Sequence, residues 1–402
     1  MFFVGAYRPE VFGIARFVPQ YVDTLADAGW SIDVFAPYPL YPAWKLDRRI
    51  PKVSNERHGS VRVTRYAPFV SRRYSPLTRG LHEASIALNA IRLLRSRVGT
   101  ADLVVVTSPP TLASACALWI AHRAGKPCMV LAYDLLADLA SDAFGLAGRV
   151  PALLLRLVES RLHNRADTVV ALTDDMASRI RQLAGRSSSL PVIRIWADDE
   201  LRHLDHAAAA KAFRERLGIP EDRRLAGFAG SFGRKQHLPL VVQAVRGLPR
   251  TFTTIFVGDG PARSEMERLA AEGPGDVRIL PPQPSAELYA FLAACDASIV
   301  IAWTRHTGSL FPSKVANVLA AGSPILAITD EGTELAALLK REDIGLTCPS
   351  LDPNRIREAI CRGVELGRDP DRRARCGHYA AAHLGRSQAM GRFLKEVDRL
   401  VP

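Results

Sequence analysis

Long apolar runs and paired cysteines are both missing from this chain of 402 residues. No uncharged apolar stretch approaches the roughly 18 residues that a membrane-spanning helix needs. The amino-terminal residues lack the basic region and apolar core of a signal peptide. The six cysteines form no Cys-x-x-Cys pair and have no histidine at metal-ligand spacing. We therefore expect a cytoplasmic protein with reduced cysteines and no bound metal.

Acidic residues are scarcer than basic ones, and the net charge is +12. Residues 52–97 are the most one-sided segment, because only Glu56 and Glu83 oppose its many arginines. Such an excess favours an anionic partner. Nucleic acid is not expected, because no nucleic-acid-binding motif and no interleaved aromatic residues accompany the arginines. An ordinary arginine-rich surface and contact with anionic membrane headgroups, or with a lipid-diphosphate acceptor, both stay open.

Strand-like and helix-like segments alternate along most of the chain, as in parallel sheets covered by helices. One series runs to about residue 195, and a second begins at residue 225. The polar, alanine-rich stretch at 198–211 lies between them. The pattern predicts an α/β protein with two doubly wound domains, residues 1–197 and 198–385. A last helix within 386–402 is expected to pack back on the first domain.

Three segments of the second series lie where a strand passes into a helix. They read GFAGSFGRK at 227–235, VGDGP at 257–261 and TGSLFPSK at 307–314. Glycines let a backbone approach a ligand closely, and free N–H groups at a helix start bind anions. Each segment taken alone can equally be a turn or a helix cap. The cation Lys314, in the first turn of a helix, favours a bound anion.

The order and spacing of these segments resemble the family 4 retaining glycosyltransferases of the GT-B fold. The resemblance lies in VGDGPAR at 257–263, LYA and CDA at 288–290 and 295–297, and PSK and AAGSPI at 312–314 and 320–325. The first half is similar to the colanic-acid and exopolysaccharide branch. Its matching segments are YRPEVFGIA at 7–15, PYPLYPAW at 37–44, SPP at 108–110, DL at 134–135 and WAD at 196–198.

The resemblance implies a GT-B fold, in which two Rossmann-like doubly wound domains face a central cleft. The second domain would bind a UDP-sugar or GDP-sugar, and the first would present the acceptor. The implied reaction is transfer of a hexose to an acceptor hydroxyl with retention, without metal or other cofactor. The acceptor would be a saccharide, a lipid-linked molecule or a small molecule. Exopolysaccharide or glycolipid assembly is expected, in the cytoplasm or peripherally on the inner face of the cytoplasmic membrane.

Matching to the family's motifs also assigns candidate site residues. The expected donor-diphosphate residues are Gly230, Ser231, Arg234, Lys235, Ser309, Leu310 and Lys314. The match also implies that a helix beginning near Ser309 binds the diphosphate through its N-terminus. The expected nucleoside residues are Gly258, Asp259, Gly260, Pro282 and Asn317. The candidates for the acceptor and catalytic cleft are Gly13, Tyr133, Asp134, Asp138 and His306. For Asp134 and Asp138, capping of the next helix is an equally good interpretation.

The chain departs from the family at two of these positions. Many members carry a pair of glutamates where this chain has Ser309 and Asn317. Asn317 can still hydrogen-bond a ribose, whereas Ser309 cannot replace a carboxylate charge. The charge of the leaving diphosphate would then be stabilised by cations and helix N–H groups. The alternatives are a secondary-metabolite glycosyltransferase with a small-molecule acceptor, a nucleotide-sugar 2-epimerase and a non-catalytic GT-B partner protein.

Overall fold

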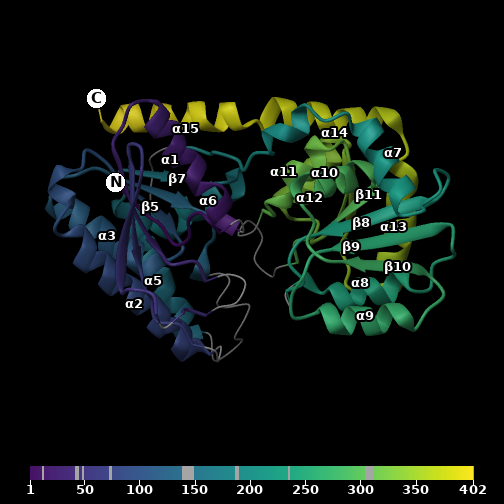
Figure 1. Cartoon of the computed structure of the whole chain (residues 1–402), viewed down its shortest axis with the longest axis horizontal. Coiled ribbons are helices and arrows are strands. Elements are labelled where there is room, and N and C mark those ends of the chain that lie inside the picture. The colour runs from purple at the N-terminus through teal and green to yellow at the C-terminus, as the bar shows by residue number, and fades with distance from the viewer. Residues whose placement is uncertain are drawn as a thin grey trace. The chain divides into compact units, whose positions relative to one another are not determined.

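The computed structural model describes most of the chain and divides it into two compact units. The described residues are 1–10, 13–40, 45–47, 49–71, 75–137, 149–185, 190–233, 236–303 and 311–401. Unit 1 comprises Met1–Arg194 and Ala389–Pro402, and unit 2 comprises Ile195–Gln388. Each unit contains one sheet with helices on its faces (Figure 1).

Unit 1 contains a seven-stranded sheet in the order β3-β4-β2-β1-β5-β6-β7. All neighbours are parallel except the antiparallel pair β3–β4 at one edge. The strands β5 and β6 are buried along their whole length, as expected for parallel strands covered on both faces. The strands are β1 Phe2–Phe3, β2 Ile32–Pro37, β3 Val53–His58, β4 Val61–Tyr66, β5 Val104–Ser108, β6 Cys128–Ala132 and β7 Thr168–Val170.

The helices of unit 1 form two layers (Figure 1). Three long helices, α2, α3 and α5, lie side by side on one face of the sheet. On the other face, the ring of Tyr21 in α1 lies 4.6 Å from that of Phe393 in α15, measured between centroids. The helices are η1 Gly13–Arg16, α1 Val18–Asp27, α2 Pro76–Leu94, η2 Val98–Thr100, α3 Thr111–Arg123, α5 Arg149–Arg165, α6 Asp174–Ala184 and α15 Arg386–Leu400.

Unit 2 contains a fully parallel six-stranded sheet in the order β10-β9-β8-β11-β12-β13. Its strands are β8 Arg224–Ala229, β9 Phe252–Val257, β10 Asp276–Leu280, β11 Ala297–Ile301, β12 Ile325–Ile328 and β13 Gly345–Cys348. Its helices are η4 Asp199–Arg202, α7 His206–Arg216, α8 Leu238–Val245, α9 Arg263–Ala271, α10 Ser285–Ala294, α11 Lys314–Ala320, α12 Glu334–Glu342, α13 Pro353–Leu366 and α14 Pro370–His383. None of the helices in the described ranges is long and apolar enough to cross a bilayer.

Both sheets reverse their strand order beside the first strand of the unit. In unit 1 the strand β1 lies between β2 and β5, and in unit 2 the strand β8 lies between β9 and β11. The loops that follow such a pair of strands diverge, and ligands bind in the opening that they leave at the carboxyl ends. The predicted class, two doubly wound α/β domains, is confirmed. The two switch points are therefore where binding sites are expected.

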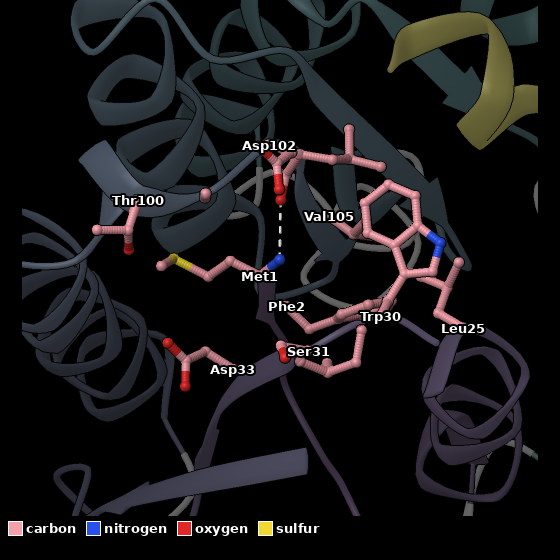
Figure 2. Close-up of a pocket in the computed structure, with 12 residues that line it drawn as sticks. Met1, Phe2, Leu25, Trp30, Ser31, Asp33, Thr100, Asp102 and Val105 are labelled. Carbon is pink, nitrogen blue, oxygen red and sulfur yellow. Dashed lines mark hydrogen bonds between the residues drawn. The ribbon is translucent and has the colours of Figure 1, made fainter. Parts of the chain in front are cut away.

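At the edge of the unit 1 sheet where the strands begin, the first residue of the chain is held by neighbouring residues. The amino group of Met1 donates a hydrogen bond to the carbonyl of Leu103 at 2.8 Å. Figure 2 shows Met1 beside Trp30 and Asp33 at a cavity of about 60 Å³. Burial lowers the pKa of this amino group to about 6. The cavity can hold a few water molecules but not a sugar nucleotide.

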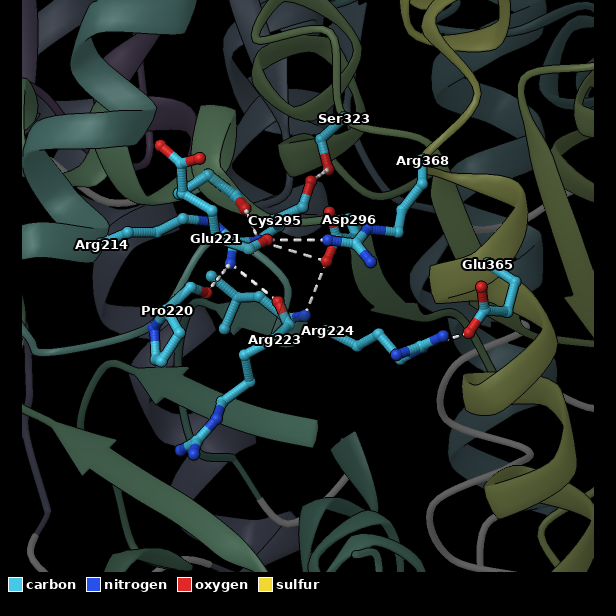
Figure 3. Close-up of polar contacts among 12 residues, drawn as sticks. Arg214, Pro220, Glu221, Arg223, Arg224, Cys295, Asp296, Ser323, Glu365 and Arg368 are labelled. Atoms are coloured by element: carbon cyan, nitrogen blue, oxygen red, sulfur yellow. Dashed lines mark hydrogen bonds and ion pairs between the residues drawn. The ribbon is translucent and has the colours of Figure 1, made fainter. Parts of the chain in front are cut away.

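The amino-terminal edge of the unit 2 sheet contains a buried ion pair. Arg214 donates to the Asp296 carboxylate at 3.2 Å and to the Arg223 carbonyl at 2.8 Å (Figure 3). Asp296 also accepts the backbone N–H of Leu225 at 2.7 Å. A buried pair is tolerated when further hydrogen bonds satisfy both partners. These residues join α7 to the starts of β8 and β11, so we assign them a structural role.

Candidate functional site

The loops that follow β8 and β9 pack against each other without room for side chains. The backbone N–H of Gly230 donates to the Val257 carbonyl at 2.9 Å. A Cβ atom at Gly258 would lie 1.9 Å from the Gly230 carbonyl oxygen, and one at Gly260 would lie 2.8 Å from that of Phe232. Both glycines have φ near +150°, which side-chain-bearing residues rarely adopt. Packing alone thus accounts for both glycines, and their nucleoside contact stays a prediction.

Lys314 places its ammonium group at the switch point of unit 2. It is the first residue of α11, and its Nζ lies 3.8 Å from the centre of the Phe228 ring in β8. The same Nζ lies 2.7 Å from the place that a Cβ atom would take at Gly230. The absence of a side chain at Gly230 therefore makes room for the ammonium group. The structure thus brings together two of the predicted diphosphate residues.

The charge of Lys314 is poorly compensated within the described part of unit 2. The residue is partly buried, and desolvation lowers the pKa of its ammonium group to about 7. Its favourable contact is the face of Phe228, which attracts a cation weakly. An ammonium group desolvated in this way gains most when an anion binds beside it. This is the strongest sign of an anion site in unit 2.

Five of the predicted site residues of this region lie outside the described residues. They are Arg234, Lys235, His306, Ser309 and Leu310. The described residues correct the expected helix start: α11 begins at Lys314 and not near residue 309, because 311–313 are not helical. Ser231 and Asp259 are solvent-exposed, directly after the ends of β8 and β9.

Pro282 is also exposed and follows β10, two strands away from β8. At ordinary strand spacing this is roughly 10 Å. A nucleoside diphosphate can span that distance, with its phosphates near Lys314 and its base toward β10. The contact of Pro282 with the base stays a prediction.

Asn317 is held by residues at the start of unit 2. Its side-chain oxygen accepts the backbone N–H of Asp198 at 3.0 Å, and its amide nitrogen donates to the Asp198 carboxylate at 2.9 Å. The hydroxyl of Tyr289 donates to the same carboxylate. Asn317 itself is only 5% exposed. Its ribose contact stays a prediction, and it would require the amide to be shared with Asp198.

Unit 1 has an opening at its own switch point, with a cavity of about 360 Å³. Gly5 and Pro110 approach closely there, since a Cβ atom at Gly5 would lie 2.6 Å from Cδ of Pro110. Of the described acceptor candidates, Gly13 lines this cavity. Tyr133 and Asp134 follow β6 and are not part of its lining, and Asp138 lies outside the described residues. The cavity is lined by Gly5, Ala6, Glu10, Gly13, Ile14, Pro37, Tyr38, Leu40, Arg79, His82, Glu83, Ile86, Pro109 and Pro110.

Four residues of this cavity with acidic or basic side chains were missed by sequence reasoning: Glu10, Arg79, His82 and Glu83. Glu10 accepts the backbone N–H of Leu40 at 2.7 Å. Glu83 lies 3.4 Å from Arg79, and its other oxygen accepts no geometrically sound hydrogen bond from the described residues. Burial raises the pKa of its carboxyl group, although Arg79 and the backbone of Leu112 act in the opposite direction. The Nδ1 of His82 lies 2.6 Å from a backbone carbonyl, and burial lowers the pKa of this imidazole. An unsatisfied buried carboxyl group at a cavity wall is suited to bind a hydroxyl group.

Two family models match the chain and together span most of it. Residues 12–196 match the glycosyl transferase 4-like domain, and residues 210–383 match the glycosyl transferases group 1. The chain therefore belongs to the group 1, or family 4, glycosyltransferases of the GT-B fold. This confirms the family resemblance of the sequence.

One curated relative matches nearly the whole chain, and another matches about three quarters of it. The putative colanic acid biosynthesis glycosyl transferase WcaI of Escherichia coli is 24% identical over 97% of each chain. The probable glycosyltransferase WbjE of Pseudomonas aeruginosa is 27% identical over 72% of this chain and 73% of its own.

Solved structures share the fold at lower identity. Sucrose-phosphate synthase of Thermosynechococcus elongatus superposes with a TM-score of 0.70 at 18% identity, covering 99% of this chain and 98% of its own. HepE of Anabaena, in complex with UDP-glucose, superposes with a TM-score of 0.67 at 14% identity, covering 99% of this chain and all of its own. Similarity at this level confirms the GT-B fold.

Proposed function

We propose that the protein transfers a hexose from a nucleoside-diphosphate sugar to an acceptor hydroxyl group with retention of configuration. The observation that supports this most is the ammonium group of Lys314 beside Gly230, desolvated at the switch point of unit 2. A diphosphate would supply the anion that this group lacks. A uridine nucleotide is the first donor to test, because the similar structure of HepE contains UDP-glucose.

In this proposal Lys314 acts mainly on the leaving group. As the bond between sugar and phosphate breaks, negative charge grows on the departing diphosphate. A cation already in place in a partly desolvated site stabilises that charge without further reorganisation. Arg234 and Lys235 are proposed to add positive charge from the loop after β8. With cations supplied by side chains, we propose a reaction that needs no metal.

We propose that the acceptor binds in the 360 Å³ cavity of unit 1. Glu10 and Glu83 offer oxygen atoms to sugar hydroxyl groups, and Arg79 offers donors to a phosphate or hydroxyl group. Apolar side chains of the lining, among them Ile14 and Ile86, suit the ring faces of a sugar or the start of a lipid. The cavity thus fits a polar acceptor with an apolar part.

A role in exopolysaccharide or glycolipid assembly is proposed for the same reason and from the similarity to WcaI along the whole chain. Such acceptors are built on lipid carriers, so we also propose that the protein works in the cytoplasm and contacts the inner membrane surface peripherally.

The test is a thermal-shift screen against uridine-, guanosine- and thymidine-diphosphate sugars, followed by turnover with lipid-linked and small-molecule acceptors. Ligands that bind the native state raise the unfolding temperature. We expect one nucleotide to stabilise the protein and free nucleoside diphosphate to form only when acceptor is added. Conversion of the sugar nucleotide to its 2-epimer without acceptor would favour an epimerase, and binding without turnover would favour a non-catalytic partner.

A further inference from the structure

The exposed large apolar side chains of the described residues are confined to unit 1. Eight of the nine lie on the neighbouring helices α2, α3 and α5, and the other, Phe69, precedes α2. The eight are Leu77, Leu81, Leu88, Leu112, Trp119, Leu153, Leu154 and Leu157. Clusters of exposed apolar side chains usually mark a contact surface. We call the outward side chains of these helices the α2–α3–α5 face.

The exposed residues of α2 form one stripe along the helix. Leu77, Leu81 and Leu88 are four and seven residues apart, so they project from the same side. Their exposed fractions are 73%, 48% and 67%. Arg92 and Arg95 continue the stripe at its carboxyl end. The stripe is therefore apolar first and basic last.

The helix α3 repeats this order, because the exposed Leu112 and Trp119 are followed by Arg123. On α5 the order is mixed: the exposed Arg156 lies between Leu154 and Leu157, and Arg161 follows them. The three helices connect strands that are parallel within one sheet: α2 links β4 to β5, α3 links β5 to β6, and α5 links β6 to β7. They therefore run in the same direction. The amino-terminal parts of the three helices therefore lie together at the edge of the sheet where the strands end. The arginines near the carboxyl ends of the helices lie toward the opposite edge.

The α2–α3–α5 face carries no exposed carboxylate. The three helices contain two acidic residues, Glu83 and Glu159, which are 8% and 0% exposed. Glu159 points inward, where it accepts the backbone N–H of Leu136 at 2.6 Å and that of Ala137 at 3.3 Å. The face is thus apolar and cationic.

Trp119 lies between two of these cations. Its ring is 5.7 Å from Cζ of Arg95 and 4.9 Å from Cζ of Arg123, and the residue is 42% exposed. An indole flanked by guanidinium groups combines an apolar ring with groups that bind phosphate. Tryptophan concentrates at the headgroup level of membranes for this reason.

The structure also shows which arginines of residues 52–97 are exposed and which are engaged within unit 1. Arg65 is 3% exposed and donates to the Pro37 carbonyl at 3.4 Å. Arg62 pairs with Asp33 at 3.5 Å, and Arg97 donates to the Thr64 hydroxyl at 3.2 Å. The arginines near the β3–β4 edge are thus largely engaged within unit 1, whereas Arg92 and Arg95 lie exposed on the α2–α3–α5 face.

We propose that the α2–α3–α5 face docks on a bilayer that contains anionic lipids. The leucines would enter the boundary between headgroups and acyl chains, and the arginines would pair with phosphate groups. Leucine is under-represented among the residues that dominate protein–protein contacts, so a lipid surface fits this composition better than a protein partner. The docking surface deepens the proposed membrane contact, but it needs no catalytic turnover.

The test is flotation of the full chain with vesicles of phosphatidylcholine alone or with about 30% phosphatidylglycerol, at low and high salt. We expect binding to the anionic vesicles only, weakened by salt. The double variant Arg92→Glu and Arg95→Glu should reduce binding by roughly tenfold or more. The matched control, Arg355→Glu with Arg362→Glu on the exposed side of α13, changes the same charge in unit 2 and should bind like the wild type.

Insertion is tested separately from charge. Leu81→Ser with Leu88→Ser should weaken binding while leaving the charge unchanged. Brominated lipids should quench tryptophan fluorescence in the wild type and much less in Trp119→Phe. Nucleotide binding should be the same in all these variants, which separates failure of the docking surface from failure of the proposed reaction.

Three results would overturn the proposal. They are absent binding to anionic vesicles, equal loss of binding in the α13 control, and a concentration-dependent dimer that Leu81→Ser with Leu88→Ser abolishes. The last result would make the face a contact between copies of the chain.

Discussion

Lys314 and Phe228 meet at the carboxyl end of the first strand of unit 2, with the ammonium nitrogen 3.8 Å from the ring centre. An aromatic face offers a cation less than water or a carboxylate does, and desolvation lowers the pKa of Lys314 to about 7. A charged Lys314 at this position lowers the stability of the ligand-free protein. Such a cost is typical of a group that stabilises a bound anion.

Replacement of Lys314 should change nucleotide affinity and protein stability in opposite directions. In Lys314→Met we expect UDP affinity to fall by about 10- to 100-fold, because a charged hydrogen bond is lost. Because the pKa is lowered from 10.5 to about 7 on folding, the folded wild type loses stability as pH falls from 10.5 to about 7, and the penalty is complete below pH 7. The variant should therefore be more stable than the wild type at pH 6. Calorimetric titration and denaturant unfolding measure the two effects. Lys340→Met, at an exposed lysine of α12, is the control.

The packing of the loops after β8 and β9 predicts different losses of stability when two of their glycines are replaced. Gly258→Ala would place a Cβ atom 1.9 Å from the Gly230 carbonyl oxygen at φ +152°. We expect a loss of roughly 3 kcal/mol or more in the free energy of unfolding. Gly233→Ala has its nearest atom at 3.7 Å and should cost little. Similar losses for both variants in urea unfolding would contradict the loop packing.

Asn317 should contribute to stability through Asp198. Asn317→Ala removes two hydrogen bonds to a single residue, so we expect a loss of about 1–3 kcal/mol in urea unfolding. The predicted ribose contact is measured in the same variant by comparing UDP with 2′-deoxy-UDP. If Asn317 binds the 2′ hydroxyl, the variant loses discrimination between the two. If discrimination is unchanged, the amide does not contact that hydroxyl group.

Glu83 should matter to the acceptor and not to the donor. In Glu83→Gln we expect a higher KM for the acceptor with unchanged UDP affinity, because the free carboxyl oxygen lines the cavity of unit 1. Burial raises the pKa of Glu83 above its usual value, so the folded state loses stability as pH rises from the unfolded pKa toward the folded one. The variant should therefore be slightly more stable than the wild type at neutral pH. An unchanged acceptor KM would remove Glu83 from the acceptor site.

The alternation of segments predicted the fold class, and the order of the VGDGP and PSK segments predicted the family. Both depend on patterns that a sequence displays directly: strand-like runs at regular intervals, and glycines where strands end. The structure then brings Gly230 and Lys314 together, two residues that the sequence analysis had placed in one diphosphate group.

The sequence patterns could not predict which charged side chains are buried or which residues they contact. Arg79 and Glu83 are four residues apart on a helix, a spacing that equally suits an exposed salt bridge. Only the opening between β1 and β5 makes Glu83 part of a cavity wall. The arginines of 52–97 show the same limit, since a count of charges does not reveal that Arg65 is enclosed by backbone carbonyls.

The most direct test of the central claim is the proton balance of nucleotide binding at pH 8. At this pH a phosphate whose second pKa is about 6 is fully ionised, while Lys314, with its pKa of about 7, is mostly neutral in the free protein. A bound diphosphate should raise that pKa, so binding should take up a proton and weaken as pH rises above 7. Calorimetry of UDP binding in two buffers of different ionisation enthalpy measures this uptake. Proton uptake that disappears in Lys314→Met is the predicted result, and binding without proton uptake in the wild type would contradict the account.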